Sequence, residues 1–199
     1  MARRGALKAN LLVAAQRAMA EHGTSVRLNQ IASEAGVTAG AVLYHYPNMQ
    51  ELLFEANQSG MARFHDHRLE ALAGISDPAA RLIQTIRTGV PEGPEDPDVR
   101  LLCALGGEAA RNNLYALLLT SLFDRQVSMY QGILDMGVTS GAFELRQDSL
   151  TIARNLVALE DAYGYRMMAK HPTLGYESAV ELIVEYARLA TGHPLPLEK

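Results

Sequence analysis

Two short helical segments separated by a tight turn constrain the fold of this chain more than any other feature of its sequence. In residues 28–35, apolar side chains recur at positions i, i+3, i+4 and i+7, the spacing of one helix face. Gly36 follows as a C-terminal stop, and the Thr38 hydroxyl can cap a second helix over residues 39–46. Two such helices joined by so short a turn are predicted to form a helix-turn-helix.

Helical periodicity also dominates the rest of the chain. No segment has four or more residues of clean apolar and polar alternation between hairpin turns, as strands would require. The fold class is therefore predicted to be all-α with about nine helices, an N-terminal helix-turn-helix head on a helical body. Besides the two helices of the motif, the sequence predicts helices over about 6–22, 48–72, 78–88, 99–112, 114–137, 148–170 and 177–191.

Charge divides the chain into the same two parts. The net charge is −4 overall, but residues 1–47 hold five basic residues against two acidic ones, while residues 48–199 hold thirteen against twenty. This asymmetry is typical of a small polyanion-binding head on an acidic body. We therefore expect a DNA-binding domain over residues 1–47 and a second domain over 48–199.

Composition limits the other classes of function. Cys103 is the only cysteine, so neither an intramolecular disulfide nor a cysteine-built zinc site is expected. The N-terminal segment is a poor signal peptide and no apolar run is long enough to cross a membrane, which favours the cytoplasm and no membrane partner. No cofactor is expected. His65 and His67 in "HDH" diverge on a helix, so a solvated face is predicted there rather than a metal site.

The last helix is apolar around most of its perimeter, with one narrow polar stripe of Glu181, Glu185 and Arg188. So wide an apolar face implies two partners, the core of the body and a second subunit. The preceding helix offers the small residues Ala158, Ala162 and Gly164 for close packing. Pairing both helices with their symmetry mates predicts a homodimer with a four-helix interface. The alternative is a monomer that buries both faces under neighbouring segments.

The run "SVRLNQIASEAGVTAGAVLYHYPNMQELL" resembles the DNA-binding head of TetR-family transcriptional regulators, with a gapless likeness over roughly residues 8–54. The resemblance implies a homodimer of nine-helix chains whose body holds a ligand cavity. It further implies a repressor that a small-molecule effector releases from a palindromic double-stranded DNA operator. The chain departs from the family pattern at Arg27 in place of a Thr or Ser cap, at Leu43 in place of a tyrosine, and at Met49 in place of a lysine.

In a helix-turn-helix the second helix enters the major groove and flanking groups hold phosphates. The small residues at the start of residues 38–46 permit close approach, and the absence of Arg or Asn from this helix leaves part of the readout to DNA shape. Tyr44 and His45 match family positions that contact phosphate, and Arg3, Arg4 and Lys8 are expected to add salt-dependent attraction. The predicted DNA-binding residues are Arg27, Gln30, Thr38, Ala39, Gly40, Ala41, Tyr44, His45 and Asn48.

The body combines apolar runs with embedded polar groups, which is typical of ligand cavities. Asp161 and Tyr165 share a helix face and, with Glu108 or Asp124 nearby, would favour a cationic or amine-bearing ligand. Asp161 can equally bond backbone at a dimer interface, and tyrosines are often ordinary core residues. The candidate ligand-binding residues are Cys103, Glu108, Tyr115, Tyr130, Asp161 and Tyr165.

Two other classes of function remain open on the sequence. An all-α enzyme would use Glu108, Asp161 or a histidine, but the sequence has no nucleophile motif, metal-ligand spacing or phosphate loop, so no catalytic residue is predicted. A helical dimer module without DNA binding would fit Met49 and the scarcity of base-reading side chains.

Overall fold

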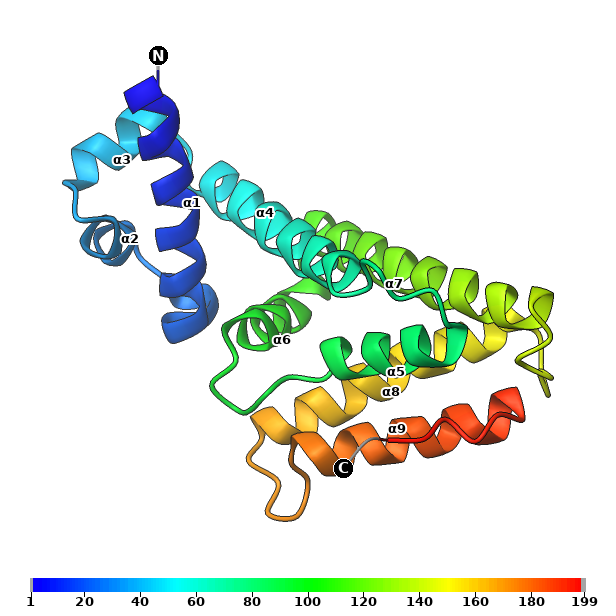
Figure 1. Cartoon of the computed structure of the whole chain (residues 1–199). Helices are drawn as coiled ribbons and strands as arrows, with labels where there is room; N and C mark the ends of the chain where they lie inside the picture. The colour runs from blue at the N-terminus through cyan, green and yellow to red at the C-terminus, as the bar shows by residue number, and fades with distance from the viewer. Residues whose placement is uncertain (1, 198–199) are drawn as a thin grey trace. The chain divides into compact units, whose positions relative to one another are not determined.

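The computed structural model describes residues 2–197, apart from the side chains of residues 2–4, 24 and 97–98. These residues form nine α-helices and one short 3-10 helix and contain no strand, which confirms the all-α prediction (Figure 1). The elements are α1 (Ala2–His22), η1 (Gly23–Ser25), α2 (Leu28–Ala35), α3 (Ala39–His45), α4 (Met49–Glu70), α5 (Pro78–Gly89), α6 (Pro97–Ala109), α7 (Asn113–Thr139), α8 (Ser149–Met168) and α9 (Tyr176–Thr191).

The helix ends follow capping residues that the sequence displays. Asp77 accepts a hydrogen bond from the Ala80 N–H at the start of α5, and Asp148 accepts one from the Thr151 N–H at the start of α8. The helix predicted over about residues 99–112 begins slightly earlier in the structure, where α6 starts at Pro97. Proline is well suited to the first position of a helix, where no intrahelical N–H bond is lost.

The chain divides into two compact units. The first, called the head unit, comprises Met1–Phe64 and Pro97–Thr120, and the second, the body unit, comprises His65–Asp96 and Ser121–Lys199. Helices α4 and α7 each begin in the head unit and end in the body unit. The functional division after residue 47 is a separate matter and stays a prediction.

The head unit is built on the apolar stripe of α1. Leu11, Ala15 and Met19 are buried, as the periodicity of this helix indicates, and they share the interior with Ile31 and Val42 of the following two helices. Gly60 of α4 also contributes to packing, because a Cβ there would lie 3.0 Å from Leu101 Cδ2 and 3.3 Å from Gln16 Nε2. The glycine thus permits close approach within the head unit.

The body unit has one apolar core to which α5, α7, α8 and α9 all contribute. The apolar residues of α9 divide between two environments: Val180, Ile183 and Val184 are buried in this core, whereas Leu182 and Leu189 are exposed. Small residues of α8 divide in the same way. Ala158 and Ala162 are exposed, but Gly164 is buried and faces the unit's own core. The expectation that Gly164 would share their outward face is therefore wrong.

Two glycines of α7 give a matched test of this packing. A Cβ on Gly132 would meet no atom within 4 Å, while a Cβ on Gly137 would overlap the ring of Phe143. We expect Gly132→Ala to raise the free energy of unfolding by about 0.5–1 kcal/mol through helix propensity. Gly137→Ala should lower it by about 1–3 kcal/mol through overpacking. Urea unfolding of the two variants measures both values, and equal effects would contradict the described contact of Gly137 with Phe143.

Candidate nucleic-acid interface

The turn between α2 and α3 is set by local hydrogen bonds. Gly36 adopts a left-handed conformation with φ of +66°, which a residue with a side chain rarely tolerates. The N–H groups of Gly36 and Val37 donate to the carbonyls of Ser33 and Ala32, closing the end of α2. Thr38 Oγ1 then accepts from the Ala41 N–H at 3.2 Å and opens α3. The predicted helix-turn-helix geometry is confirmed.

The inner face of α3 is held by one apolar and one aromatic side chain. Val42 is fully buried, and Tyr46, the residue that ends the helix, is nearly so. The Tyr46 hydroxyl donates to Glu55 Oε2 at 2.8 Å, and Lys8 Nζ lies 2.9 Å from Glu55 Oε1. Burial and the Glu55 carboxylate raise the pKa of Tyr46, so its hydroxyl stays a donor. These contacts brace α3 against α1 and α4.

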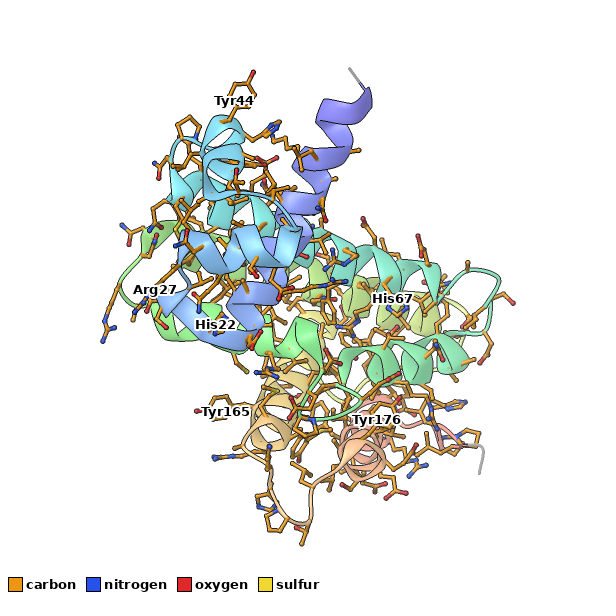
Figure 2. All side chains as sticks on the ribbon, turned by 90° about the vertical axis from the view of Figure 1, so that its left-hand side faces the viewer. His22, Arg27, Tyr44, His67, Tyr165 and Tyr176 are labelled. Carbon is orange, nitrogen blue, oxygen red and sulfur yellow. The ribbon has the colours of Figure 1, made fainter. Side chains whose placement is uncertain are left out.

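The outer face of α3 is exposed and mostly small. Tyr44 has 71% of its surface exposed and Leu43 has 43%, while Thr38 and Gly40 are exposed beside them. Figure 2 shows Tyr44 projecting away from the head, with Arg27 projecting outward from the start of α2. Ala39 and Ala41 are half-buried. The exposed face of α3 therefore consists mainly of small side chains, and the phenol of Tyr44 projects beside them.

His45 is half-buried and its ring lies edge-on to the ring of Tyr44, with 5.4 Å between the centroids. The contact limits the orientations that the exposed tyrosine adopts. A phenol O–H and an imidazole N–H side by side can both donate to phosphate oxygens.

The three remaining predicted DNA contacts also serve helix starts. Gln30 Oε1 accepts from the Arg27 N–H at 2.7 Å, so the side chain of the third helical residue satisfies the backbone of the capping position, while the Arg27 side chain makes no capping hydrogen bond. Asn48 Oδ1 accepts from the Gln50 N–H at 2.9 Å at the start of α4. Because the side-chain oxygens of Gln30 and Asn48 are used in this way, the groups that can donate to DNA are their amide nitrogens and the exposed guanidinium of Arg27.

Sequence reasoning missed two features of this surface. Leu43 lies on the exposed face of α3, where an apolar side chain can contact a thymine methyl group. Its position next to Tyr44 on a short helix was the feature of the sequence that indicated this exposure. Lys8 was expected to face phosphate but forms the ion pair with Glu55. The side chains of Arg3 and Arg4 lie outside the described residues.

Residues 11–56 match the model of a family described as "Bacterial regulatory proteins, tetR family". The match spans α2, α3 and the whole turn that joins them. Over these residues, the chain is similar to the DNA-binding segment of that family. This family consists of regulatory proteins, so the enzyme alternative finds no support in it.

Solved structures share the fold of this chain. A TetR transcription regulator from Haloarcula marismortui has a TM-score of 0.83 at 23% identity, with 94% of this chain and 99% of that one covered. A protein assigned as a transcriptional regulator from Saccharomonospora viridis, in complex with choline, has a TM-score of 0.83 at 23% identity and covers 91% and 95%. No curated protein matches the chain in sequence. At this identity the likeness extends to the fold alone.

The candidate ligand-binding residues do not gather in one compact unit. Cys103, Glu108 and Tyr115 belong to the head unit, where burial and the charge of Glu108 raise the pKa of Tyr115. The other three, Tyr130, Asp161 and Tyr165, belong to the body unit.

Within the body unit, Asp161 and Tyr165 are both exposed on one face of α8. Figure 2 shows Tyr165 pointing outward. Tyr130, by contrast, is fully buried.

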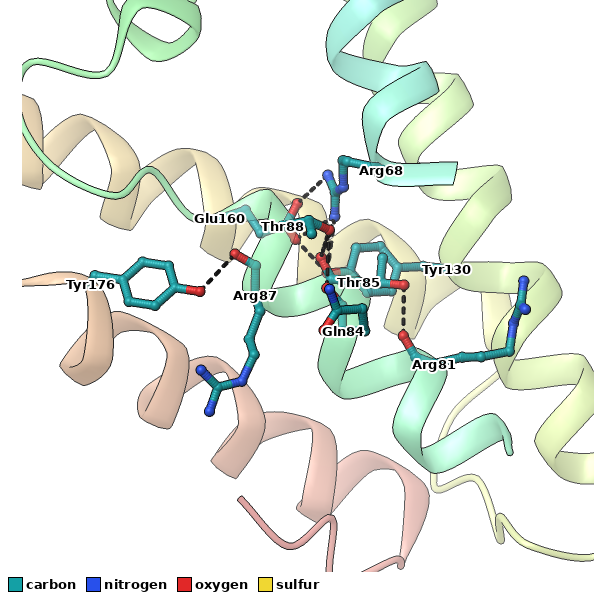
Figure 3. A network of polar contacts seen from close by, with 9 residues as sticks. All are labelled: Arg68, Arg81, Gln84, Thr85, Arg87, Thr88, Tyr130, Glu160 and Tyr176. Atoms are coloured by element: carbon teal, nitrogen blue, oxygen red, sulfur yellow. Dashed lines mark hydrogen bonds and ion pairs between the residues drawn. The ribbon is translucent and has the colours of Figure 1, made fainter. Parts of the chain in front are cut away.

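Tyr130 belongs to a buried ionic cluster that the sequence reasoning missed (Figure 3). Arg68 is 1% exposed and Glu160 4% exposed, and their side chains form a double contact, Nη2 to Oε1 at 2.7 Å and Nη1 to Oε2 at 3.0 Å. The Tyr130 hydroxyl donates to Glu160 Oε1, and Arg68 Nη2 donates to the Thr85 carbonyl at 2.8 Å. Burial raises the pKa of Glu160, while Arg68 and Tyr130 oppose that rise. The sequence indicated this cluster only through a charged residue within an apolar stripe, Arg68 in α4 and Glu160 in α8.

Among the described residues, no group of three or more His, Cys, Asp and Glu side chains is placed to hold a metal ion. Over the same part of the chain, no helix is both long and apolar enough to cross a membrane.

The phosphate role of Tyr44 and His45 predicts a loss of affinity that is blind to sequence. We expect the double variant Tyr44→Phe, His45→Ala to weaken binding about equally on every DNA sequence tested and to leave the sequence preference unchanged, since phosphate contacts carry no base information. Fluorescence anisotropy on a bound sequence and its point mutants, with Glu34→Gln as a control for a surface change, measures both. A shifted sequence preference at unchanged affinity would overturn the assignment.

Proposed function

We propose that this chain is a transcriptional repressor that binds a palindromic DNA operator as a homodimer in the cytoplasm and leaves it when a small-molecule effector binds. The observation that carries the proposal is the exposed outer face of α3, held by a capped turn and a braced inner face within the segment that matches the family. A helix presented in this way is suited to the major groove.

The chemistry of the α3 face supports DNA as the partner. Thr38 and Gly40 leave room for close approach of the helix, and Leu43 offers an apolar contact. Tyr44 and His45 supply donors for phosphate, and Arg27 supplies a charge. Because α3 contains no Arg or Asn side chain that could make a bidentate hydrogen-bond contact with guanine or adenine, sequence preference should depend partly on DNA shape.

The exposed apolar face of α8 and α9 supports the homodimer. Leu182 and Leu189 have 47% and 68% of their surfaces exposed, and Ala158 and Ala162 are exposed on the neighbouring helix. Exposed apolar surface of this kind is typically covered by another subunit. A two-fold axis through this face would give two reading helices, as a palindromic operator requires.

Buried polar groups support an effector. Asn57 of α4 is fully buried, and neither its side-chain oxygen nor its nitrogen has a hydrogen-bond partner among the described residues. A ligand that both donates and accepts would satisfy it. The S. viridis relative binds choline, which makes cationic metabolites a reasonable first class to screen. An effector that prefers a conformation of the chain with lower affinity for the operator weakens operator binding by the same coupling factor.

The primary test selects DNA from a random duplex pool with the full chain and follows the enriched sequence in a salt titration. We expect an enriched palindrome whose affinity exceeds that for scrambled DNA by about 1,000-fold or more, and whose binding weakens linearly in log salt. No enrichment at moderate salt would contradict the repressor proposal and favour the helical dimer module instead.

The dimer is tested by placing charge on its proposed interface. We expect Leu182→Glu combined with Leu189→Glu to shift the chain from dimer to monomer in sedimentation equilibrium and to weaken operator binding, because four carboxylates would be desolvated at one interface. Leu69→Glu, at a leucine of similar exposure on α4, is the matched control and should leave the dimer intact. A dimer that survives the double variant would place the interface elsewhere.

A further inference from the structure

Several polar atoms on α4 and α7 of the body unit are buried without a hydrogen-bond partner. Gln126 is 3% exposed, and neither its Oε1 nor its Nε2 has a partner among the described residues. The same holds for Nδ1 of His65 and for Nε of Arg125, although both of these residues are half-buried as a whole. We call His65, Arg125 and Gln126 the α4–α7 polar cluster. Buried polar atoms in proteins nearly always have partners, so a group of them without any requires an explanation.

The register of the two helices brings these residues together. Arg68 of α4 lies against Tyr130 of α7, with 3.4 Å between Nη2 and the hydroxyl oxygen, and Figure 1 shows the two helices running in the same general direction. One turn earlier on the same helix faces are His65, three residues before Arg68, and Gln126, four residues before Tyr130. The Gln126 amide is close enough to the imidazole to raise the pKa of His65. All four residues belong to the body unit, so the cluster lies within one compact unit.

The α4–α7 polar cluster is electropositive. Burial lowers the pKa of His65, and the positive charges of Arg125 and Arg68 lower this pKa further, while Asp66 opposes them. Arg125 has the largest effect of these three charges, and it forms no ion pair within the described part of the chain. Surroundings that disfavour a positive charge on the imidazole favour a negative charge at the same place. The cluster is therefore suited to an anion rather than to a cation.

Gln126 restricts the kind of anion further. Its Nε2 can donate to a negative oxygen, but its Oε1 can only accept. A ligand that satisfies both atoms must carry a hydrogen-bond donor beside its negative oxygen. An α-hydroxy carboxylate and hydrogen phosphate both meet this requirement, whereas choline would bring a positive charge next to Arg125.

We propose that the α4–α7 polar cluster binds the effector through an oxyanion with an adjacent hydrogen-bond donor. The inference rests on the proposed function, because it names the class of effector that this function requires. Arg125 pairs with the negative oxygen, Gln126 Nε2 donates to the oxyanion, and Gln126 Oε1 accepts from the adjacent hydroxyl group. His65 Nδ1 donates to a second oxygen of the same group. Without such a ligand the buried Gln126 amide destabilises the chain, so stability and binding are opposed at this residue.

Thermal unfolding of the full chain at constant ionic strength tests the binding. The probes are lactate, α-hydroxyhexanoate, mandelate and inorganic phosphate, each at about 10 mM so that weak binding is detected. We expect at least one of them to raise the melting temperature by about 3 °C or more. The neutral amides of the three acids, and choline, should not. A response to the acids alone or to phosphate alone distinguishes a carboxylate ligand from a phosphate ligand.

Two variants of the cluster and one matched control assign the binding to these residues. Gln126→Leu replaces the unpartnered amide by an apolar group of similar volume, so it should raise the melting temperature of the free chain by about 2 °C or more and abolish the response to the oxyanion. Arg125→Gln should abolish the response as well. Arg87→Gln is the control, because Arg87 is a half-buried arginine of the same unit whose side chain points away from Arg68 (Figure 3). It should keep the full response.

The inference would be overturned by no response to any of the four oxyanions, by a response to choline alone, or by an equal response in the wild type and both cluster variants. If Gln126→Leu fails to fold, Arg125→Gln decides. The stabilising oxyanion should also weaken wild-type binding to the selected palindrome by about 10-fold and leave that of Arg125→Gln unchanged. An unchanged wild-type affinity would contradict the effector role. A chain that binds the oxyanion but selects no DNA would contradict the proposed function and leave the site itself standing.

Discussion

The helices of the body unit are joined by a charged side chain that is buried away from water. The guanidinium of Arg68 is buried with the carboxylate of Glu160, and hydrogen bonds from Tyr130 and to the Thr85 carbonyl complete the cluster. Removing one partner of such a pair typically costs about 3–5 kcal/mol, whereas replacing the whole set by apolar groups is often neutral. Four helices are thus tied together by an interaction that contributes geometry more than net stability.

The head uses a different kind of ion pair for a related purpose. Lys8 and Glu55 are both partly exposed, and exposed pairs contribute only about 0–1 kcal/mol. The pair is important because Glu55 also accepts a hydrogen bond from the Tyr46 hydroxyl, and this bond joins the end of α3 to α4. The reading helix is therefore braced on its inner face while Tyr44 stays free of the core on its outer face. A small, rigid and exposed helix suits readout by shape and phosphate position.

Much of this fold was predictable from local chemistry. Gly36 and Thr38 fix the turn, Asp77 and Asp148 cap α5 and α8, and the periodicity of α1 identifies its buried stripe, because these effects act within one or two turns of the chain. The cluster was not predicted, because Arg68 and Glu160 are 92 residues apart in sequence and only the tertiary fold brings them together. Tyr165 is exposed and Tyr130 is buried. This difference was not predicted either, because it too depends on the tertiary fold.

Binding of DNA by the outer face of α3 is tested most directly by amide hydrogen exchange with and without the selected palindrome. Bound DNA should slow exchange by about 3-fold or more in α3, because it stabilises the helix that it contacts. Exchange in α3 that is unchanged by the palindrome would contradict DNA binding through this helix.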